Sequence, residues 1–198
     1  MISISPPPGL IAIRAFEVSI DEFLGSVASE VLTGRPGCKL MALKEPIVVL
    51  PKAEYSPTVK IVHIWEPSCR PGTTVLRANL EDGWSTLTYA LAERRAWTYL
   101  KVRVGDPWDA WPICELEWFV NGRSKRFVRA MKDDPRWEFF VRGDALSFEE
   151  TKAYRRRRIR DRFTAEMLWS YVGALGWPSD GLWSATRCSE FKVPPKAG

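Results

Sequence analysis

The sequence contains one histidine, His63, among its 198 residues. This excludes a zinc site built from several histidines and any mechanism that needs two of them. The phosphate-binding patterns GxGxxG and GxxxxGKS/T are missing, and so are the nucleophile elbow GxSxG and the metalloprotease pattern HExxH. The sequence therefore predicts no cofactor, no metal site and no catalytic residue.

Long apolar runs are also lacking, and none approaches the ~20 residues that a membrane-spanning helix needs. The N-terminus, MISISPPPGL, has neither the basic nor the apolar region of a secretory signal. The cysteines Cys38, Cys69, Cys114 and Cys188 lie far apart without a CxxC pair, so we interpret them as reduced thiols. These absences predict a cytoplasmic protein without a membrane association.

Positive charge, by contrast, is plentiful and unevenly distributed. The formal net charge is +5, and residues 123–162 contain 14 Lys and Arg against 7 Asp and Glu. The basicity therefore belongs to one segment. With 45% hydrophobic and 27% charged residues the chain is typical of a globular protein, and its length fits a single domain, 1–198. We divide that domain into an N-terminal subregion, 1–80, an α+β core, 80–176, and a C-terminal tail, 177–198.

The stretch 116–140 predicts three consecutive antiparallel strands. Asn121-Gly122 suits a two-residue type I′ turn, because both central positions of that turn need a positive φ. Asp133–Pro135 ends the next strand, since proline cannot donate to a sheet ladder. The result is a three-stranded meander, around which we expect the rest of the chain to be organised.

Three segments carry the signature of a helix N-terminus, a Ser or Thr whose hydroxyl can accept from the backbone N–H three residues later. They begin at Ser19, Ser147 and Thr164. The last two predict two C-terminal helices, while segments such as Trp97–Val104 alternate as strands do. The predicted fold class is α+β: a largely antiparallel β-sheet with a central meander, packed by helices that include the two C-terminal ones.

The helix predicted after Ser147 holds the strongest local charge. We select Arg155, Arg156 and Arg160 as candidate partner-binding residues. Two other interpretations stay open. The arginine stems can cover apolar surface and pair with acidic groups of the same fold, or the guanidinium groups can bind the phosphates of a nucleic acid.

Two tryptophans in the loop 105–112, Trp108 and Trp111, are the candidate aromatic contacts. The chain has 10 Trp, more than its length predicts, and packing in the core accounts for such residues as readily as binding does. Stacking on a nucleic-acid base or burial against a protein partner would suit these two indoles.

Only three side chains suggest catalysis. His63 lies in an alternating strand, and Glu115 and Glu117 stand two residues apart on one strand face, where paired carboxylates can divide acid and base roles. The simpler interpretation is a charged sheet face with cross-strand partners such as Lys125 and Arg129. An enzyme built on His63, Glu115 and Glu117 is therefore our third hypothesis.

A family resemblance begins after the Asn121-Gly122 turn. It is carried by RFVRAMKDD at 126–134, RWEFF at 136–140, Gly143, Leu146, Phe148-Glu149, Tyr154 and IRDRF at 159–163. With these residues the region 80–176 resembles small bacterial proteins of the toxin-immunity type. The resemblance implies tight binding to one cognate toxin, without cofactor or turnover, and transfers no site residues. Because the candidate surface is basic, we expect an acidic protein partner, with nucleic acid as the alternative.

Overall fold

The computed structural model describes residues 1–5, 9–32, 37–44, 47–50, 52, 54–106, 112–133 and 135–194. The strands are β1 (Ile2–Ser5), β2 (Ile11–Phe16), β3 (Lys39–Leu43), β4 (Ile47–Val49), β5 (Lys60–Pro67), β6 (Thr74–Ala78), β7 (Tyr99–Val104), β8 (Ile113–Val120), β9 (Arg123–Asp133), β10 (Arg136–Arg142) and β11 (Ser184–Val193). The helices are α1 (Ile20–Val27), α2 (Ser85–Arg95), α3 (Ala165–Ala174) and α4 (Ser179–Leu182). Short helical turns are η1 (Ala28–Leu32), η2 (Ala153–Arg155) and η3 (Ile159–Asp161).

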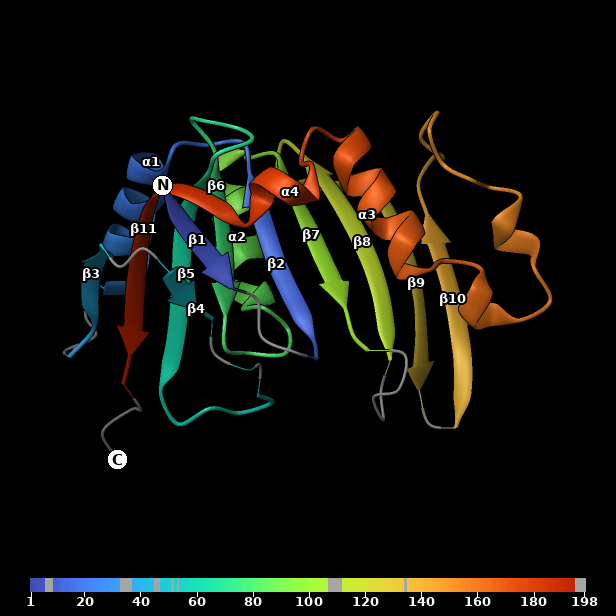
Figure 1. The fold of residues 1–198 in the computed structure, drawn as a ribbon, viewed down its shortest axis with the longest axis horizontal. Helices are drawn as coiled ribbons and strands as arrows, with labels where there is room; N and C mark the ends of the chain where they lie inside the picture. Colours follow the sequence, from blue (N-terminus) through green and yellow to red (C-terminus); the bar gives the residue numbers. More distant parts are fainter. Residues whose placement is uncertain are drawn as a thin grey trace.

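The strands form one 11-stranded sheet in the order β10-β9-β8-β7-β2-β6-β5-β11-β1-β4, with β3 also paired to β11 (Figure 1). The neighbouring strands run antiparallel, except that β1 and β4 run parallel. The predicted α+β class is confirmed, and α3 and α4 are two C-terminal helices. The meander of β8, β9 and β10 is central in the chain but forms one end of the sheet.

Local signals produce the predicted turn and two of the predicted caps. Asn121 and Gly122 have φ of 51° and 72°, and Val120 pairs with Arg123, which closes the two-residue hairpin. The backbone N–H of Glu22 donates to the hydroxyl of Ser19 at 3.2 Å. The same bond joins Met167 to Thr164 at 3.3 Å. Both helix starts therefore follow from residues within one turn.

Strand alternation divides the molecule into two cores on opposite faces of the sheet. Along β7, Leu100 and Val102 point into the core under α3 and α4, which cross the near face in Figure 1. Tyr99 points to the other core, which α1 and α2 cover on the far face. Lys101 and Arg103 share that far face with Tyr99. The helices in the described ranges leave the far face of β9 and β10 uncovered (Figure 1), while Tyr89 of α2 packs on Phe119 at one end of β8.

Chain segments that are distant in sequence meet in this one sheet. β2 lies between β6 and β7, and β11, from the C-terminal tail, lies between β5 and β1. Strands from 1–80, 80–176 and 177–198 are thus hydrogen-bonded to one another.

Candidate functional site

The segment between β10 and α3 carries the candidate arginines, and it is not the helix that we predicted after Ser147. Two short 3-10 turns, η2 and η3, are joined through Arg156, whose backbone is extended with φ −56° and ψ 145°. A continuous helix needs an apolar stripe to bury, and this charged segment offers chiefly Phe148 and Tyr154. Each of these rings is anchored separately, Tyr154 against Phe139 and Phe148 against the core.

A buried ion pair fixes this segment to the sheet. Glu149 accepts hydrogen bonds from Nε and Nη2 of Arg126 on β9, and the two side chains are 1% and 4% exposed. The same carboxylate accepts from the backbone N–H of Leu146 at 3.0 Å and from the hydroxyl of Tyr154 at 2.7 Å. Arg126 also donates to the carbonyl of Gly143 at 2.6 Å. This satisfied network holds the chain after β10 in one conformation.

Electrostatics keep the guanidinium group of Arg126 charged at neutral pH. Burial alone would lower the pKa of Arg126, but the hydrogen bonds and the charge of Glu149 outweigh it, so the pKa is raised. Burial raises the pKa of Tyr154, and its bonds to Tyr171 and Glu149 act in the same direction. The phenol therefore remains a hydrogen-bond donor to the carboxylate.

We call residues 149–162 the arginine segment, which projects beyond β10 at the edge of the molecule (Figure 1). Seven of its residues are Lys or Arg and three are Asp or Glu. Five of its arginines are exposed: Arg155, Arg156, Arg157, Arg158 and Arg160. The three that we selected are thus on the surface, and Arg157 and Arg158, which we did not select, lie beside them.

These five guanidinium groups differ in what they contact. Arg156 lies 3.3 Å from Glu150 and donates to the carbonyl of Asp161 at 3.0 Å. Arg160 lies 3.7 Å from the carboxylate of Asp161. The side chains of Arg155, Arg157 and Arg158 make no hydrogen bond or ion pair with the part of the chain that the structure describes. Their charge is therefore available to a partner.

Arg160 also borders a cavity of about 390 Å³. Trp137, Phe163 and the N-terminal end of α3 at Thr164 contribute to its lining. The other candidates, Trp108 and Trp111, lie outside the described residues. The structure thus places an apolar hollow next to one candidate arginine.

The three residues of the catalytic hypothesis do not meet. His63 is buried on β5, with Nε2 3.2 Å from Oε2 of Glu190 on β11. Burial lowers the pKa of His63 in spite of that carboxylate. Three strands separate β5 from β8, which carries Glu115 and Glu117, a distance of about 19 Å at the usual strand spacing. The proposed acid–base constellation is therefore wrong.

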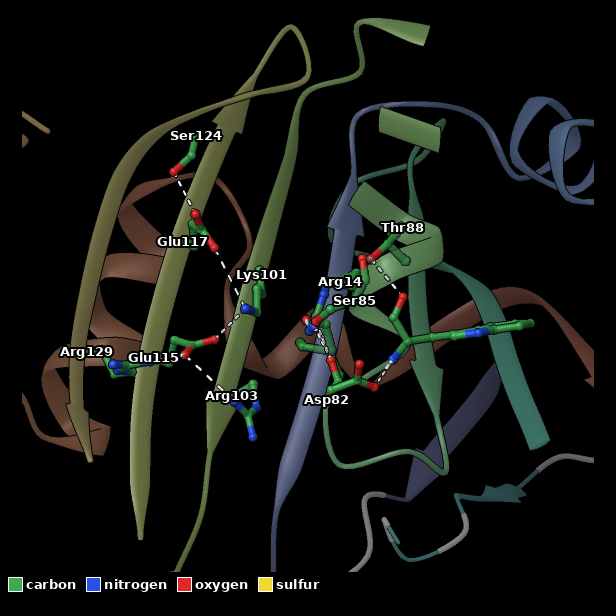
Figure 2. A network of polar contacts seen from close by, with 12 residues as sticks. Arg14, Asp82, Ser85, Thr88, Lys101, Arg103, Glu115, Glu117, Ser124 and Arg129 are labelled. Atoms are coloured by element: carbon green, nitrogen blue, oxygen red, sulfur yellow. Dashed lines mark hydrogen bonds and ion pairs between the residues drawn. The ribbon is translucent and has the colours of Figure 1, made fainter. Parts of the chain in front are cut away.

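Glu115 belongs instead to a charged row on the far face. Arg103 on β7, Glu115 on β8 and Arg129 on β9 are register partners, and Figure 2 shows the two arginines on opposite sides of the glutamate. Oε1 of Glu115 lies 2.8 Å from Nζ of Lys101. Burial raises the pKa of Glu115, but the charges of Lys101, Arg103 and Arg14 overcome this, and the net shift is downward. The buried carboxylate is therefore ionised.

Glu117 anchors a second group of contacts on this face (Figure 2). Its carboxylate accepts from the hydroxyl of Ser124 at 2.7 Å and from Arg142 at 3.1 Å, and Lys101 lies 3.7 Å away. Of the two cross-strand partners that we predicted, Arg129 is confirmed opposite Glu115.

Lys125 is not a partner of either glutamate: the Asn121-Gly122 turn by itself would pair it with Trp118 on the opposite face, and a β-bulge removes it from the pairing. The register runs from the pair Trp118 and Arg126 directly to the pair Phe119 and Ser124. Lys125 is the extra residue and is exposed, and the hydroxyl of Ser124 donates to Glu117. The same shift of register brings Arg129 opposite Glu115. A bulge leaves no clear signal in the sequence of this hairpin.

Comparisons of the chain with protein-family models, with curated proteins and with solved structures give no match. Within the described residues, no group of three His, Cys, Asp or Glu side chains is placed to hold a metal ion. The helices described are too short or too polar to cross a membrane. The four cysteines, all within the described residues, form no disulfide with one another. Function must therefore be argued from the surfaces themselves.

Proposed function

We propose that this protein is a binding protein of the toxin-immunity type, which neutralises a cognate bacterial toxin by docking the arginine segment on an acidic surface of that toxin. The observation that carries the proposal is that the exposed guanidinium groups of Arg155, Arg157 and Arg158 have no hydrogen-bond or ion-pair partner among the described residues, on a backbone held by the buried Glu149–Arg126 pair. A segment fixed before binding loses little conformational freedom when it docks.

The charge of the segment defines the partner's chemistry. Arginine is enriched at the centres of protein interfaces because its planar group pairs with carboxylates at two points. An excess of positive charge also accelerates the encounter with an acidic surface. The cavity beside Arg160 can receive an apolar side chain of the same partner. The expected epitope is acidic at its rim and carries one apolar anchor.

Nucleic acid is the second candidate, because the same arginines can neutralise phosphates. The sequence predicted a basic helix as the phosphate-binding surface, but the segment contains two three-residue 3-10 turns instead. What supports it now is charge alone. Binding to nucleic acid should then be sequence-independent and strongly weakened by salt.

The test measures binding of the full chain to the toxin encoded beside its own gene, by calorimetry at physiological salt. The variant Arg155→Glu/Arg157→Glu/Arg158→Glu should weaken binding at least about tenfold, since hydrogen bonds between charged groups contribute about 1.5–3 kcal/mol each. The matched control, Lys39→Glu/Lys52→Glu/Arg123→Glu, changes the net charge equally at exposed positions away from the arginine segment and its cavity.

Equal binding by the two triple variants, or no binding of the neighbouring gene product, would overturn the proposal. Labelled single- and double-stranded oligonucleotides, titrated at two salt concentrations, test the alternative in parallel. Oligonucleotide binding that the arginine variant loses and the control retains would favour nucleic acid instead.

A further inference from the structure

The far face of β7 to β9 contains two guanidinium groups that have no hydrogen-bond partner in the part of the chain that the structure describes. Arg103 and Arg129 are 23% and 30% exposed, and their Nη1 atoms lie 3.8 and 4.0 Å from the carboxylate of Glu115. These distances are too long for hydrogen bonds. The Nε atoms of both arginines are buried and unpaired among the described residues, and Arg129 otherwise only overlies the ring of Phe127. Unpaired buried donors are rare in folded proteins, so these two call for a physical explanation.

Positive charge exceeds negative charge on this face. Five cations stand around two carboxylates: Arg14, Lys101, Arg103, Arg129 and Arg142 around Glu115 and Glu117. Arg14 is fully buried, and its guanidinium donates to the backbone carbonyl of Asp82 and to the hydroxyl of Ser85, so its charge is fixed in place (Figure 2). The carboxylate of Asp82 also lies near Arg14 and offsets part of its charge. A surplus of cations in a partly buried site produces a strong attraction for anions.

We propose that this face is a binding site for a small oxyanion with at least two negative groups, held by Arg103, Arg129 and Lys101. The two arginines are two strand spacings apart, about 10 Å between Cα atoms, and their side chains leave the same face of the sheet. Their outer N–H groups can therefore meet one anion above Glu115, each donating to a different negative group. Lys101, 16% exposed, adds a third donor.

The anion would lie on the open face above Glu115, and two hollows flank that position without including Arg129 or Lys101 in their lining. One hollow, of about 560 Å³, includes Ser124 and Arg142 in its lining. Another, of about 530 Å³, includes Arg103 and Trp84. Carboxylates and phosphates share the required chemistry, so the ligand is either a di- or tricarboxylate or a compound with a pyrophosphate group.

The experiment titrates the full chain with citrate and with pyrophosphate by calorimetry, at constant ionic strength in a chloride buffer. Arg103→Gln/Arg129→Gln should weaken saturable binding at least about tenfold. The matched control Arg155→Gln/Arg157→Gln removes the same charge from the arginine segment and should bind as the parent does. Glu117→Gln should bind a few-fold more tightly, because it releases Lys101 and Arg142 from a competing carboxylate.

The titrations identify the class of the ligand and test whether the site exists. Saturation by citrate alone identifies a carboxylate ligand, and saturation by pyrophosphate alone identifies a phosphate ligand. Absence of saturable binding to both, or equal weakening by the two arginine double variants, would refute the site. If circular dichroism shows that the Arg103 and Arg129 double variant is unfolded, Arg129→Gln alone, at the more exposed position, serves as the test. Toxin binding by the arginine segment is unaffected by a failure here.

Discussion

Glu149 and Arg126 form a two-point ion pair beneath the arginine segment, and both side chains are almost excluded from solvent. Such a pair adds little net stability when both partners are present, because their dehydration offsets the attraction. It is costly to break, since the remaining charge stays buried without compensation. The value of the pair therefore lies in holding the arginine segment in one conformation.

Glu149→Gln should lower the free energy of unfolding by about 3–5 kcal/mol, because the charge of Arg126 stays buried. Glu150→Gln is the control: that carboxylate is 57% exposed and pairs with Arg156, so it should cost at most about 1 kcal/mol. Urea denaturation of both variants gives the comparison. A cost for Glu149→Gln no larger than that of its neighbour would mean that the ion pair does not anchor the segment.

Gly143→Ala tests the close approach to β9 of the chain that follows β10. Gly143 has φ +80°, and a Cβ atom there would lie 1.9 Å from the carbonyl oxygen of Lys125. Steric overlap and the positive φ together should cost about 2–4 kcal/mol. Gly72 has a similar φ of +78° with nothing within 4 Å, so Gly72→Ala should cost only about 1 kcal/mol. Equal melting temperatures of the two variants would show that the contact with Lys125 relaxes freely.

Features that depend on neighbouring residues could be predicted from the sequence. The Asn121-Gly122 turn and the caps at Ser19 and Thr164 form because a few adjacent residues decide their geometry. The exposure of Arg156 and Arg160 was also predictable, because charged side chains are seldom fully buried unless they are paired.

Features that depend on residues distant in the sequence could not be predicted from the sequence. The segment after Ser147 has a helical cap signature, but Glu149 is engaged by Arg126, 23 residues earlier, and no apolar stripe holds a helix together. The charged row of Arg103, Glu115 and Arg129 on the far face forms only in the observed register of β7, β8 and β9. The bulge at Lys125 sets that register, and the sequence does not reveal it. Placement of β2 and β11 within the sheet depends on pairings between opposite ends of the chain.

His63 predicts a loss of stability in mildly acidic solution. Its pKa in the folded protein lies below the usual 6.5, so the unfolded chain takes up the proton first as pH falls. The free energy of unfolding should be constant above about pH 6.5 and fall below it, by up to about 1.4 kcal/mol per pH unit, until the folded pKa is reached.

Because His63 is the single histidine of the chain, the comparison is direct. The free energies of unfolding of the parent and of His63→Gln are measured by denaturation at pH 7.5, 6.5 and 5.5. Over this range the free energy of unfolding should fall with pH only in the parent. Carboxylates titrate mainly below it. Identical slopes in both proteins would assign the acid sensitivity to other groups.

The last prediction concerns Arg156 and Arg160, which are 46% and 59% exposed but already have acidic neighbours. Arg156→Glu/Arg160→Glu should leave stability within about 1 kcal/mol, because exposed ion pairs contribute little. Toxin association should slow while dissociation changes less, since charges at a rim act mainly during the encounter. The effect should shrink at high salt, where the Debye length falls to about 3 Å at 1 M.

Arg155→Glu/Arg157→Glu/Arg158→Glu should behave differently, because these groups have no described partner and are free to pair with toxin carboxylates. The toxin should dissociate faster from this variant as well as associate more slowly. Part of the change in dissociation rate should persist at high salt, because direct hydrogen bonds survive screening. The two variants are distinguished by association rate constants from stopped-flow mixing and dissociation rate constants from surface plasmon resonance, each measured at two salt concentrations. If both change only the association rate, the whole segment steers the toxin without touching it, and the contact must lie elsewhere on the molecule.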